Sequence, residues 1–498
     1  MRQHRKRRLL CQFIIAQCTK VRQSQPSKRV TDRRTKRLDD RRQSECGGYH
    51  FRFRSCTNTI LLFAVRDLEA RALFKTKLEN LWQPYKPGLT PEVPQVRKLQ
   101  GCNLSLFKRM LSRGLHSSAA KTVAVGISGG VDSSAAAALL LQQGYRVIGV
   151  HMTNWSHDIE DDHHCEGRRD AEIAADVCQR LQIPFHRVAF DRQYWTSVFT
   201  GFLGSLQKGK TPNPDVQCNV HIKFSLFRRY CLDELGADFA ATGHYAELGA
   251  GPCLRRAADL SIDQTYFLCQ VPGSAFRDIM FPVGHLTKSQ VRSIAAEHDF
   301  PTASRKSSTG LCFVGKRKFP VFLRQFMSER PGRFLDPNGH LLGYHDGQMF
   351  YTIGQRAKIG GLPEPYFVSG KSGDDVLVVP GRSHPSLFCK TFLCQNLNWV
   401  SGELPAEVDT QNGFLCWLSI RYRSQLGRCR LRRVDSNMFE VEMIDLHRAA
   451  TPGQIAAFYS EDGVCYGGAD IECTGRSIDE LGLNIDPKGR DIIIQHPC

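Results

Sequence analysis

Residues 121–141 read KTVAVGISGGVDSSAAAALLL, and the rest of the chain is expected to fold around this stretch. The pattern is typical of a short apolar strand, a turn of glycine and serine, and a helix rich in alanine and leucine. Gly129 and Gly130 let the backbone approach a ligand, and the free N–H groups of the first helical turn attract anions. Ser128 and Ser133 add hydroxyl donors. We therefore predict an anion-binding loop, with an ordinary strand-to-helix turn as the alternative.

The loop differs from the phosphate-binding P-loop. No lysine follows the glycines, so the pattern G-x-x-x-x-G-K-[ST] is absent. SGGVDSS (residues 128–134) instead resembles the signature of the ATP pyrophosphatases, the PP-loop family. That resemblance implies that ATP is split between its α- and β-phosphates and that the adenylate activates a carbonyl oxygen. Several PP-loop enzymes share this step, so the motif alone leaves the substrate open.

Strand-like and helix-like stretches alternate from residue 121 to about residue 248. This alternation predicts a parallel sheet covered by helices on both faces. Ligands of such sheets bind at the carboxyl ends of the strands. SGGVDSS, residues 152–155 and residues 242–245 each follow a predicted strand. We therefore expect these three stretches to meet in one crevice.

The pattern changes twice further along the chain. Residues 316–389 are punctuated by glycine, which is typical of a small α+β domain, and residues 390–475 read as short strands with turns, which is typical of a small antiparallel β-barrel. The predicted fold is thus an α/β PP-loop ATP pyrophosphatase domain with a parallel sheet (residues 120–315), a middle α+β domain and a C-terminal barrel. Residues 476–498 are polar and are expected to form a tail.

Positive charge is concentrated near the N-terminus. The 498 residues hold 67 Lys+Arg and 49 Asp+Glu, a net charge of +18. Residues 1–119 contain 27 and 8 of these, a net of +19, which leaves 40 and 41, a net of −1, for the rest. The segment 110–121, MLSRGLHSSAAK, has no acidic residue and resembles a mitochondrial transit peptide. We expect import into the mitochondrial matrix; a nucleic-acid-binding arm and a dispensable extension are the alternatives for residues 1–119.

The 19 cysteines include no CxxC pair, so the common zinc and redox spacings are absent. Most of them are expected to be buried and reduced. No apolar run reaches the roughly 18 residues of a membrane helix, so we expect no membrane partner. We expect a monomer in a reducing compartment.

Two cysteines have unusual surroundings. Residues 211–224 read TPNPDVQCNVHIKF, and the two prolines predict a stiff loop that holds Asp215 and Cys218 before the next helix begins. The dipole of that helix would favour the Cys218 thiolate. Cys312 follows a turn of serine, threonine and glycine and precedes three basic residues, which also favours a thiolate. A buried structural cysteine is the alternative for each.

Seven motifs occur in order: GISGGVDSS, TPNPDVQCNVHIKF, ATGHYA, STGLCFVG, TIGQR, IRYR and TPGQ. With them, residues 122–472 resemble the tRNA-specific 2-thiouridylases, transferases that install sulfur at C2 of the wobble uridine, uridine 34. The family acts on the tRNAs for Lys, Glu and Gln. With the transit-like segment, the chain most resembles the mitochondrial member.

The resemblance implies a role for each matching residue. Cys312 would carry a persulfide received from a cysteine desulfurase or sulfur relay, Cys218 would be the nucleophile, and a Cys218–Cys312 disulfide would form during the cycle. Asp215 would act as acid/base, and Asp132 would help to hold Mg²⁺. The implied ATP-binding residues are Gly126, Ile127, Ser128, Gly129, Gly130, Val131, Asp132, Ser133, Met152 and Gly243. The implied tRNA contacts are Asn213, Pro214, Asp215, His244, Asp263, Gln264, Arg421, Tyr422 and Gln454.

The chain departs from the family pattern at one point. Ile262 stands where the family has lysine, so the phosphate contact of that lysine is not expected. Two other functions are compatible with the loop: another adenylating PP-loop enzyme, such as an amidotransferase or a lysidine-forming ligase, and a catalytically dead RNA-binding relative. Neither would require both Cys218 and Cys312.

Overall fold

The computed structural model describes residues 120–155, 166–306, 311, 314, 317–485 and 492–493. All of these residues belong to one compact unit of the chain. The predicted extension 1–119 and Cys312 lie outside the described residues.

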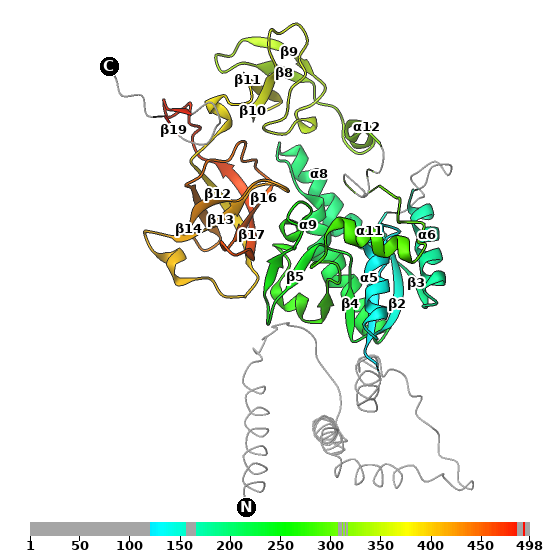
Figure 1. Ribbon diagram of the computed structural model, residues 1–498. Helices are drawn as coiled ribbons and strands as arrows, with labels where there is room; N and C mark the ends of the chain where they lie inside the picture. The colour runs from blue at the N-terminus through cyan, green and yellow to red at the C-terminus, as the bar shows by residue number, and fades with distance from the viewer. Residues whose placement is uncertain are drawn as a thin grey trace, which may run out of the picture. The chain divides into compact units, whose positions relative to one another are not determined.

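A five-stranded parallel sheet forms the first domain (Figure 1). Its strands, in spatial order, are β3 (Phe185–Ala189), β2 (Arg146–Thr153), β1 (Thr122–Gly126), β4 (Phe239–Ala241) and β7 (Ile279–Met280). Every pairing in it is parallel. This arrangement confirms the sheet that the alternation of strands and helices predicts.

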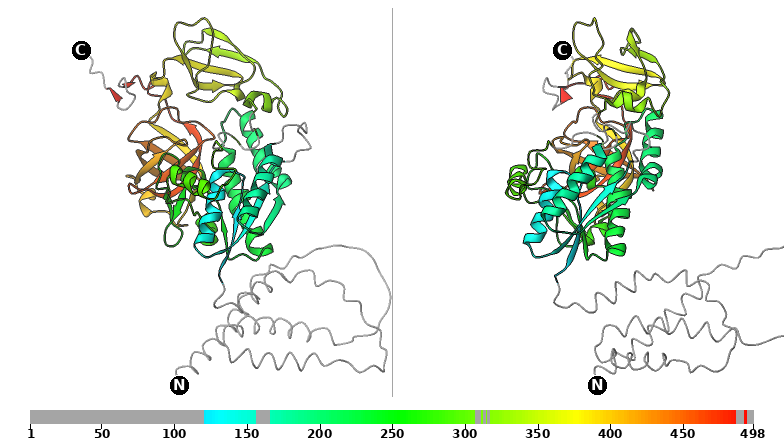
Figure 2. Two further views of the ribbon diagram at one scale, coloured as in Figure 1. Left: turned by 45° about the vertical axis from the view of Figure 1, so that its right-hand side comes forward. Right: turned by 90° about the vertical axis from the view of Figure 1, so that its right-hand side faces the viewer.

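Helices cover both faces of the sheet, as Figure 2 shows. Val123 and Val125 of β1 pack into one buried cluster and Ala124 into another, because successive residues of a strand point to opposite faces. The first cluster includes residues of α5 (Val131–Gln142), α6 (Glu166–Arg180) and α11 (Lys288–Glu297). The second includes residues of α7 (Asp191–Tyr194), η2 (Trp195–Phe199), α8 (Thr200–Gln207), α9 (Pro214–Cys218), η3 (Asn219–Phe227), η4 (Tyr230–Glu234), α10 (Thr265–Leu268) and η5 (Gly273–Asp278).

The start of α9 corrects one prediction. The two prolines of TPNPD were expected to exclude helix, yet α9 begins at Pro214 and places Asp215 and Cys218 inside it. Pro214 occupies the first helical position, where the missing N–H would have no intrahelical partner and the fixed φ suits the helix. The helix then continues through η3.

The middle domain holds a four-stranded sheet in the order β10-β11-β8-β9. Phe334, Ala357, Val368, Val376 and Val378 form its buried core. Its elements are α12 (Phe319–Leu323), β8 (Gly332–Leu335), β9 (Leu341–His345), η6 (Gln348–Phe350), β10 (Tyr366–Ser372) and β11 (Asp375–Pro380).

The third domain is an antiparallel barrel, as predicted. Its strands follow the order β12-β15-β14-β13-β16-β17, and a further pairing of β12 with β17 closes it. The hairpin of β5 (Ala246–Leu248) and β6 (Leu254–Arg256), which belongs to the first domain's sequence, joins the outside of β17. The barrel strands are β12 (Thr391–Trp399), β13 (Phe414–Ser419), β14 (Gly427–Asp435), β15 (Met438–Met443), β16 (Ile455–Tyr459) and β17 (Val464–Thr474), with η7 (Pro385–Leu387) and η8 (Ala406–Asp409) in the connections.

The expected C-terminal tail is wrong for residues 476–485. Ile478 is fully buried beside Val379, Leu387 and Phe388, and Ser477 bridges to Cys389. Burial of an isoleucine of this kind stabilises the fold by about 1.5–3 kcal/mol, so this segment packs as part of the domain. Two short strands follow, β18 (Asn484–Ile485) and β19 (Ile492–Ile493).

Two further observations concern the burial of the cysteines and the length of the apolar helices. Most cysteines in the described ranges are buried, as the composition predicts: Cys178, Cys218, Cys231, Cys269, Cys389, Cys394, Cys416, Cys429 and Cys465. Within the same ranges, no helix is both long and apolar enough to cross a membrane.

Candidate functional site

The stretch between β1 and α5, residues 126–134, forms a tight turn that we call the anion loop. Gly130 caps α5, and the backbone N–H of Ser128 donates to the Ser133 hydroxyl at 3.1 Å. The Ser133 hydroxyl in turn donates to the Gly130 carbonyl at 3.1 Å. Gly129 has a left-handed φ of 77°, and a Cβ there would lie 2.7 Å from the Asp170 carbonyl oxygen. The predicted strand, turn and helix start are thus present, with glycine where no side chain fits.

Two more predicted stretches meet this loop. A Cβ on Gly243 would lie 2.6 Å from the Ser133 backbone nitrogen, so the ATGHYA segment passes directly against the start of α5. His151 of β2 contacts the Ile127 carbonyl through Nδ1 at 2.9 Å, one residue before Met152. The carboxyl ends of β1, β2 and β4 therefore converge as the sequence predicts.

Asp132 lies in the first turn of α5 with two partners that sequence reasoning missed. Its Oδ1 accepts hydrogen bonds from the Tyr245 hydroxyl at 2.6 Å and from the Lys288 ammonium at 2.6 Å. Lys288 Nζ also lies 5.2 Å from the centre of the Tyr245 ring. Burial, together with the nearby Asp132 carboxylate, raises the pKa of Tyr245, which keeps that hydroxyl a donor. Asp132 is an oxygen ligand suited to Mg²⁺, and both of these hydrogen bonds go to its Oδ1.

Arg305 is a further cation at the anion loop. Its guanidinium donates to the Gly129 carbonyl at 2.7 Å and pairs with Asp170 at 2.5 Å. Arg292 donates to the Ala303 and Arg305 carbonyls and so holds this segment against α11. Arg305 connects the loop to the chain that leads towards Cys312.

Asn213, Asp215 and Cys218 lie at the start of the α9 helix. The Asn213 side chain caps the helix by accepting from the Asp215 N–H at 3.2 Å. Burial raises the pKa of the Asp215 carboxyl, and the charge of Lys223 opposes this shift. Cys218 is 2% exposed, and its Sγ lies 3.9 Å from the amide nitrogen of Asn154, which follows β2. Cys218 thus lies at the same carboxyl ends of the sheet strands as the anion loop.

His244 is partly buried beside the rings of Phe224 and Phe281. The Thr242 hydroxyl lies 2.7 Å from its Nδ1, and Lys223 Nζ lies 3.4 Å from its Nε2. Burial, with a smaller contribution from Lys223, lowers the pKa of His244 well below its ordinary value. The imidazole is therefore neutral near pH 7 and suits hydrogen bonding rather than phosphate binding.

Asp263 and Gln264 form hydrogen bonds within the protein. The buried Asp263 carboxylate accepts from Arg256, from the Ala257 N–H and from the Thr265 hydroxyl. Gln264 exchanges hydrogen bonds with the Tyr245 backbone, because its side chain accepts from the Tyr245 N–H and its own N–H donates to the Tyr245 carbonyl. Direct tRNA contact by this pair stays a prediction.

Arg421, Tyr422 and Gln454 lie in the barrel loops. The Gln454 amide donates to the Thr211 carbonyl at 2.7 Å, which joins the TPGQ and TPNPD motifs. Arg421 lines a pocket of about 370 Å³ where four motif-bearing segments meet, and the ring of Tyr422 lies 4.5 Å from that of Phe267. We call this the arginine pocket; its lining is Thr211, Thr352, Ile353, Gly354, Gln355, Arg421, Thr451 and Gln454.

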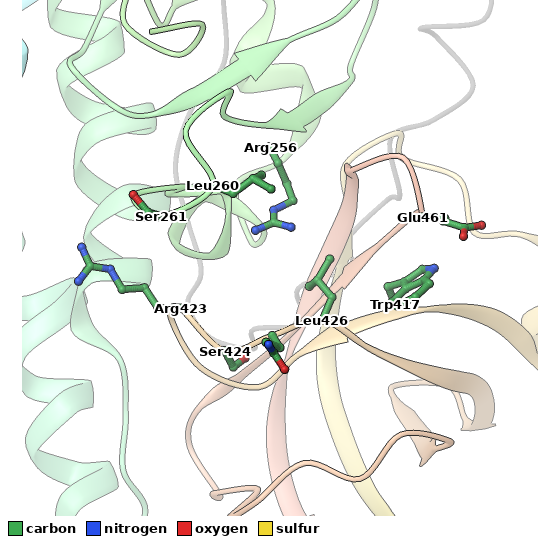
Figure 3. A pocket seen from close by; sticks show the side chains of 9 residues that line it. Arg256, Leu260, Ser261, Trp417, Arg423, Ser424, Leu426 and Glu461 are labelled. Carbon is green, nitrogen blue, oxygen red and sulfur yellow. The ribbon is translucent and has the colours of Figure 1, made fainter. Parts of the chain in front are cut away.

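A second pocket, of about 530 Å³, lies between the barrel and the segment that begins at the end of β6 (Figure 3). Arg256, the last residue of β6, lines it with Leu260 and Ser261, and the barrel supplies Trp417, Arg423, Ser424, Gln425, Leu426 and Glu461. None of the predicted site residues that the structure describes lines it. Within the described ranges, no group of three His, Cys, Asp or Glu side chains is arranged to hold a metal ion.

Three family models match consecutive parts of the chain. They are described as the tRNA methyl transferase HUP domain (residues 121–316), the tRNA methyl transferase PRC-barrel domain (321–380) and the aminomethyltransferase beta-barrel domain (389–471). A solved complex of a 4-thiouridine synthetase with RNA and bound ATP aligns at 18% identity and a TM-score of 0.27, over 41% of this chain and 49% of that chain.

Curated relatives match at much higher identity. The tRNA-specific 2-thiouridylase MnmA of Staphylococcus epidermidis is 43% identical over 70% of this chain and 95% of its own length. The MnmA 1 protein of Geobacillus kaustophilus is 42% identical over 71% and 95%, and MnmA of Legionella pneumophila is 42% identical over 70% and 98%. The chain therefore belongs to the tRNA-specific 2-thiouridylase family of sulfurtransferases.

Proposed function

We propose that this chain uses ATP to convert the wobble uridine of tRNA to 2-thiouridine. One observation carries the proposal: Cys218 and the anion loop share one edge of the parallel sheet. Phe227 of the Cys218-bearing helix touches Gly126, where a Cβ would lie 3.1 Å from the Phe227 ring, and Cys218 itself contacts Asn154 after β2. The names of the relatives support the same reaction.

The first step of the proposed reaction turns the O2 oxygen of the uridine into part of a leaving group. The N–H groups and hydroxyls of the anion loop bind the phosphates of ATP, and the uridine O2 attacks the α-phosphorus while pyrophosphate leaves. Mg²⁺ supplies neutralising charge at the phosphates when it is bound, with Asp132 as the carboxylate that fits it. Lys288 and Tyr245 fix the orientation of Asp132.

The second step supplies sulfur. Cys312 carries a persulfide, and Cys218 attacks the Cys312 sulfur so that hydrosulfide leaves and a Cys218–Cys312 disulfide forms. The hydrosulfide attacks C2 of the adenylated uridine, and AMP departs with the former O2. In the other order, the persulfide attacks C2 first and Cys218 then releases the thiolated base. Either order leaves the disulfide, which a thiol reductant reopens with two electrons.

Asp215 suits proton transfer beside the base. Its raised pKa brings the carboxyl closer to neutral pH, where a group can both accept and donate a proton. Asn213 and Pro214 precede it at the helix start and would contact the flipped uridine.

Mass spectrometry of tRNA after reaction with the purified chain, ATP and a persulfide donor tests the proposal. Sulfur-for-oxygen exchange at uridine 34 is expected, with one AMP formed for each exchange. Cys218→Ala and Cys312→Ala should each abolish it, whereas Cys473→Ser, at an exposed cysteine, should not. Thiolation that survives either of the first two changes would contradict the mechanism. AMP formation without thiolation would favour an amidotransferase or lysidine-forming ligase, and tRNA binding without AMP would favour a dead relative.

Substrate choice and location belong to the same proposal. We expect the tRNAs for Lys, Glu and Gln to be the substrates, and the mitochondrial matrix to be the place of action. The transit-like composition of residues 110–121 supports the latter. Tagged full-length chain and a version that starts at Met110 should both reach the matrix and be cleaved; cytosolic protein in both cases would contradict this.

A further inference from the structure

Asn154, the first residue after β2, contacts the cysteine that the proposed reaction uses as its nucleophile. The Asn154 Nδ2 lies 3.9 Å from the Cys218 Sγ, within reach of a hydrogen bond to sulfur. Cys218 is the last residue of α9 and follows Asp215 by one helical turn. Residues three apart in a helix share a face, so Asp215 and Cys218 point to the same side. Asn154 therefore meets the helix face that carries both proposed reacting groups.

Only one end of the Asn154 amide has a polar partner. Among the described residues, the Cys218 sulfur is the one hydrogen-bond partner of this side chain, and the buried Asn154 Oδ1 has none. A buried acceptor without a partner costs about 1–3 kcal/mol, and such groups are uncommon in native proteins. An apolar side chain at this position would avoid the cost. The contact with Cys218 is thus the polar interaction that an amide provides here and an apolar side chain does not.

The position of Asn154 is fixed on both sides along the chain. Before it, the Thr153 carbonyl accepts from the N–H of the first residue after β3 at 2.8 Å. After it, the Trp155 ring packs edge-on against Phe199, with the ring centres 4.8 Å apart. Phe199 is fully buried in the cluster that also contains Cys218. A side chain held in this way can orient the group that it contacts.

We propose that Asn154 is a positioning residue for Cys218, whose sulfur its amide N–H orients and whose thiolate it stabilises. The inference rests on the proposed function, in which the Cys218 thiolate attacks the Cys312 sulfur and hydrosulfide leaves. Cys218 is 2% exposed, so water contributes little to the stability of a thiolate there. A hydrogen bond to the charged form favours that form, and the amide N–H supplies one. Asn154 thus acts in the sulfur step, after pyrophosphate has left.

Asn154→Asp tests the proposal, because aspartate keeps the shape of the side chain but replaces the donor with a negative charge. With ATP, a substrate tRNA and the persulfide preloaded on the chain, the single-turnover rate of thiolation should fall about 100-fold. Pyrophosphate formation should be unchanged. Asn154→Ala removes the donor without adding charge and should slow thiolation about tenfold. Asn154→Gln keeps an amide N–H and should recover part of the rate.

The control variant is Asn412→Asp. It makes the same charge change at an exposed residue in the turn before β13, and both rates should stay at the wild-type values. Wild-type thiolation rates in Asn154→Asp and Asn154→Ala would overturn the proposal. Loss of pyrophosphate formation in Asn154→Asp would also overturn it, because the change would then damage the ATP site rather than act through Cys218.

Added sodium sulfide gives a second measurement. Hydrosulfide from solution can attack C2 of the adenylated uridine, so that a C–S bond forms and AMP leaves with the former O2. This route bypasses Cys218, and we expect sulfide to restore thiolation in Asn154→Asp as it does in Cys218→Ala. Restoration in Cys218→Ala alone would assign Asn154 to the fold and overturn the proposal. A wild-type chain that does not thiolate tRNA would reject the proposed function itself, whereas unaffected Asn154 variants beside an active wild type reject this inference alone.

Discussion

The anion loop and the arginine pocket both gather residues of the sequence motifs, but they are built in opposite ways. The loop comes from one continuous stretch, residues 126–134, and its nearby ammonium, Lys288, is matched by Asp132. The pocket comes from four distant segments, and its arginine, Arg421, donates to the Arg448 and Ala449 carbonyls. The ammonium beside the loop is thus paired with a carboxylate, whereas among the described residues no carboxylate lines the pocket.

The anion loop depends most on the close approach of the Gly243 backbone to the start of α5. Gly243→Ala would place a Cβ 2.6 Å from the Ser133 nitrogen and push α5 away from its position. We expect tRNA-dependent AMP formation to fall about 100-fold, since displacement of reacting groups by about 1 Å has this effect. Gly201→Ala is the control: its Cβ meets nothing within 4 Å, so activity should persist. Full activity in Gly243→Ala would show that the loop tolerates displacement.

Replacement of Asp263 distinguishes a structural role of its buried carboxylate from a direct contact with RNA. Asp263→Asn breaks the ion pair with Arg256 at 3.1 Å, and we expect the free energy of unfolding to fall by about 3 kcal/mol. Asp346→Asn, at an exposed pair with Arg324, should change it by about 1 kcal/mol or less. Chemical denaturation measures both. Unchanged stability with weakened tRNA binding would instead support Asp263 as a tRNA contact.

Replacement of Lys288 tests whether its ion pair with Asp132 at the anion loop is needed for activity. Lys288→Met frees the Asp132 carboxylate from its 2.6 Å ion pair, and we expect kcat for AMP formation to fall about tenfold, or about 1.4 kcal/mol, as the carboxylate loses its fixed orientation. Lys288→Arg should restore part of kcat. Lys390→Met removes a more exposed ion pair with Glu442 and serves as the matched control. A change confined to the KM for ATP would assign Lys288 to ground-state binding instead.

The smallest expected effect concerns Lys371, which donates to the Gly209 carbonyl at 2.9 Å close to the TPNPD segment. Burial lowers the pKa of Lys371 to about 8 from 10.5, so the unfolded chain binds more protons between these values. Stability of the wild type relative to Lys371→Met should therefore rise with pH from about 8 to about 10. Thermal midpoints of both proteins across this window measure the trend. Parallel curves would show that the ammonium is not desolvated.

Local pattern predicted much of the fold and of the anion loop. The glycines, the serines and the apolar strand of residues 121–141 are close together in the sequence. Local conformational preferences therefore determine how they are arranged. Residues 242–245, which include Tyr245, were expected at the loop, whereas Lys288 and Arg305 were missed, because they reach it across 156 and 176 residues of sequence. No spacing rule connects groups so far apart.

The start of α9 escaped prediction for a local reason. Pro214 was interpreted as a helix breaker, although the first helical position tolerates proline, so the start of α9 was placed too late. Arg448 carried no signal in the sequence, because it reaches the Gly354 carbonyl of the TIGQR motif across 94 residues.

The β5–β6 hairpin constrains the order in which the chain matures. Leu254 and Arg255 pair with Cys465 and Val464 of β17, which leave the ribosome roughly two hundred residues later. At about 5–20 residues per second, that delay is on the order of 10–40 s, during which the outer edge of β6 has no strand beside it. An unpaired edge invites association with other chains. A nascent chain whose parallel-sheet domain is complete thus still has an unpaired strand edge until β17 emerges.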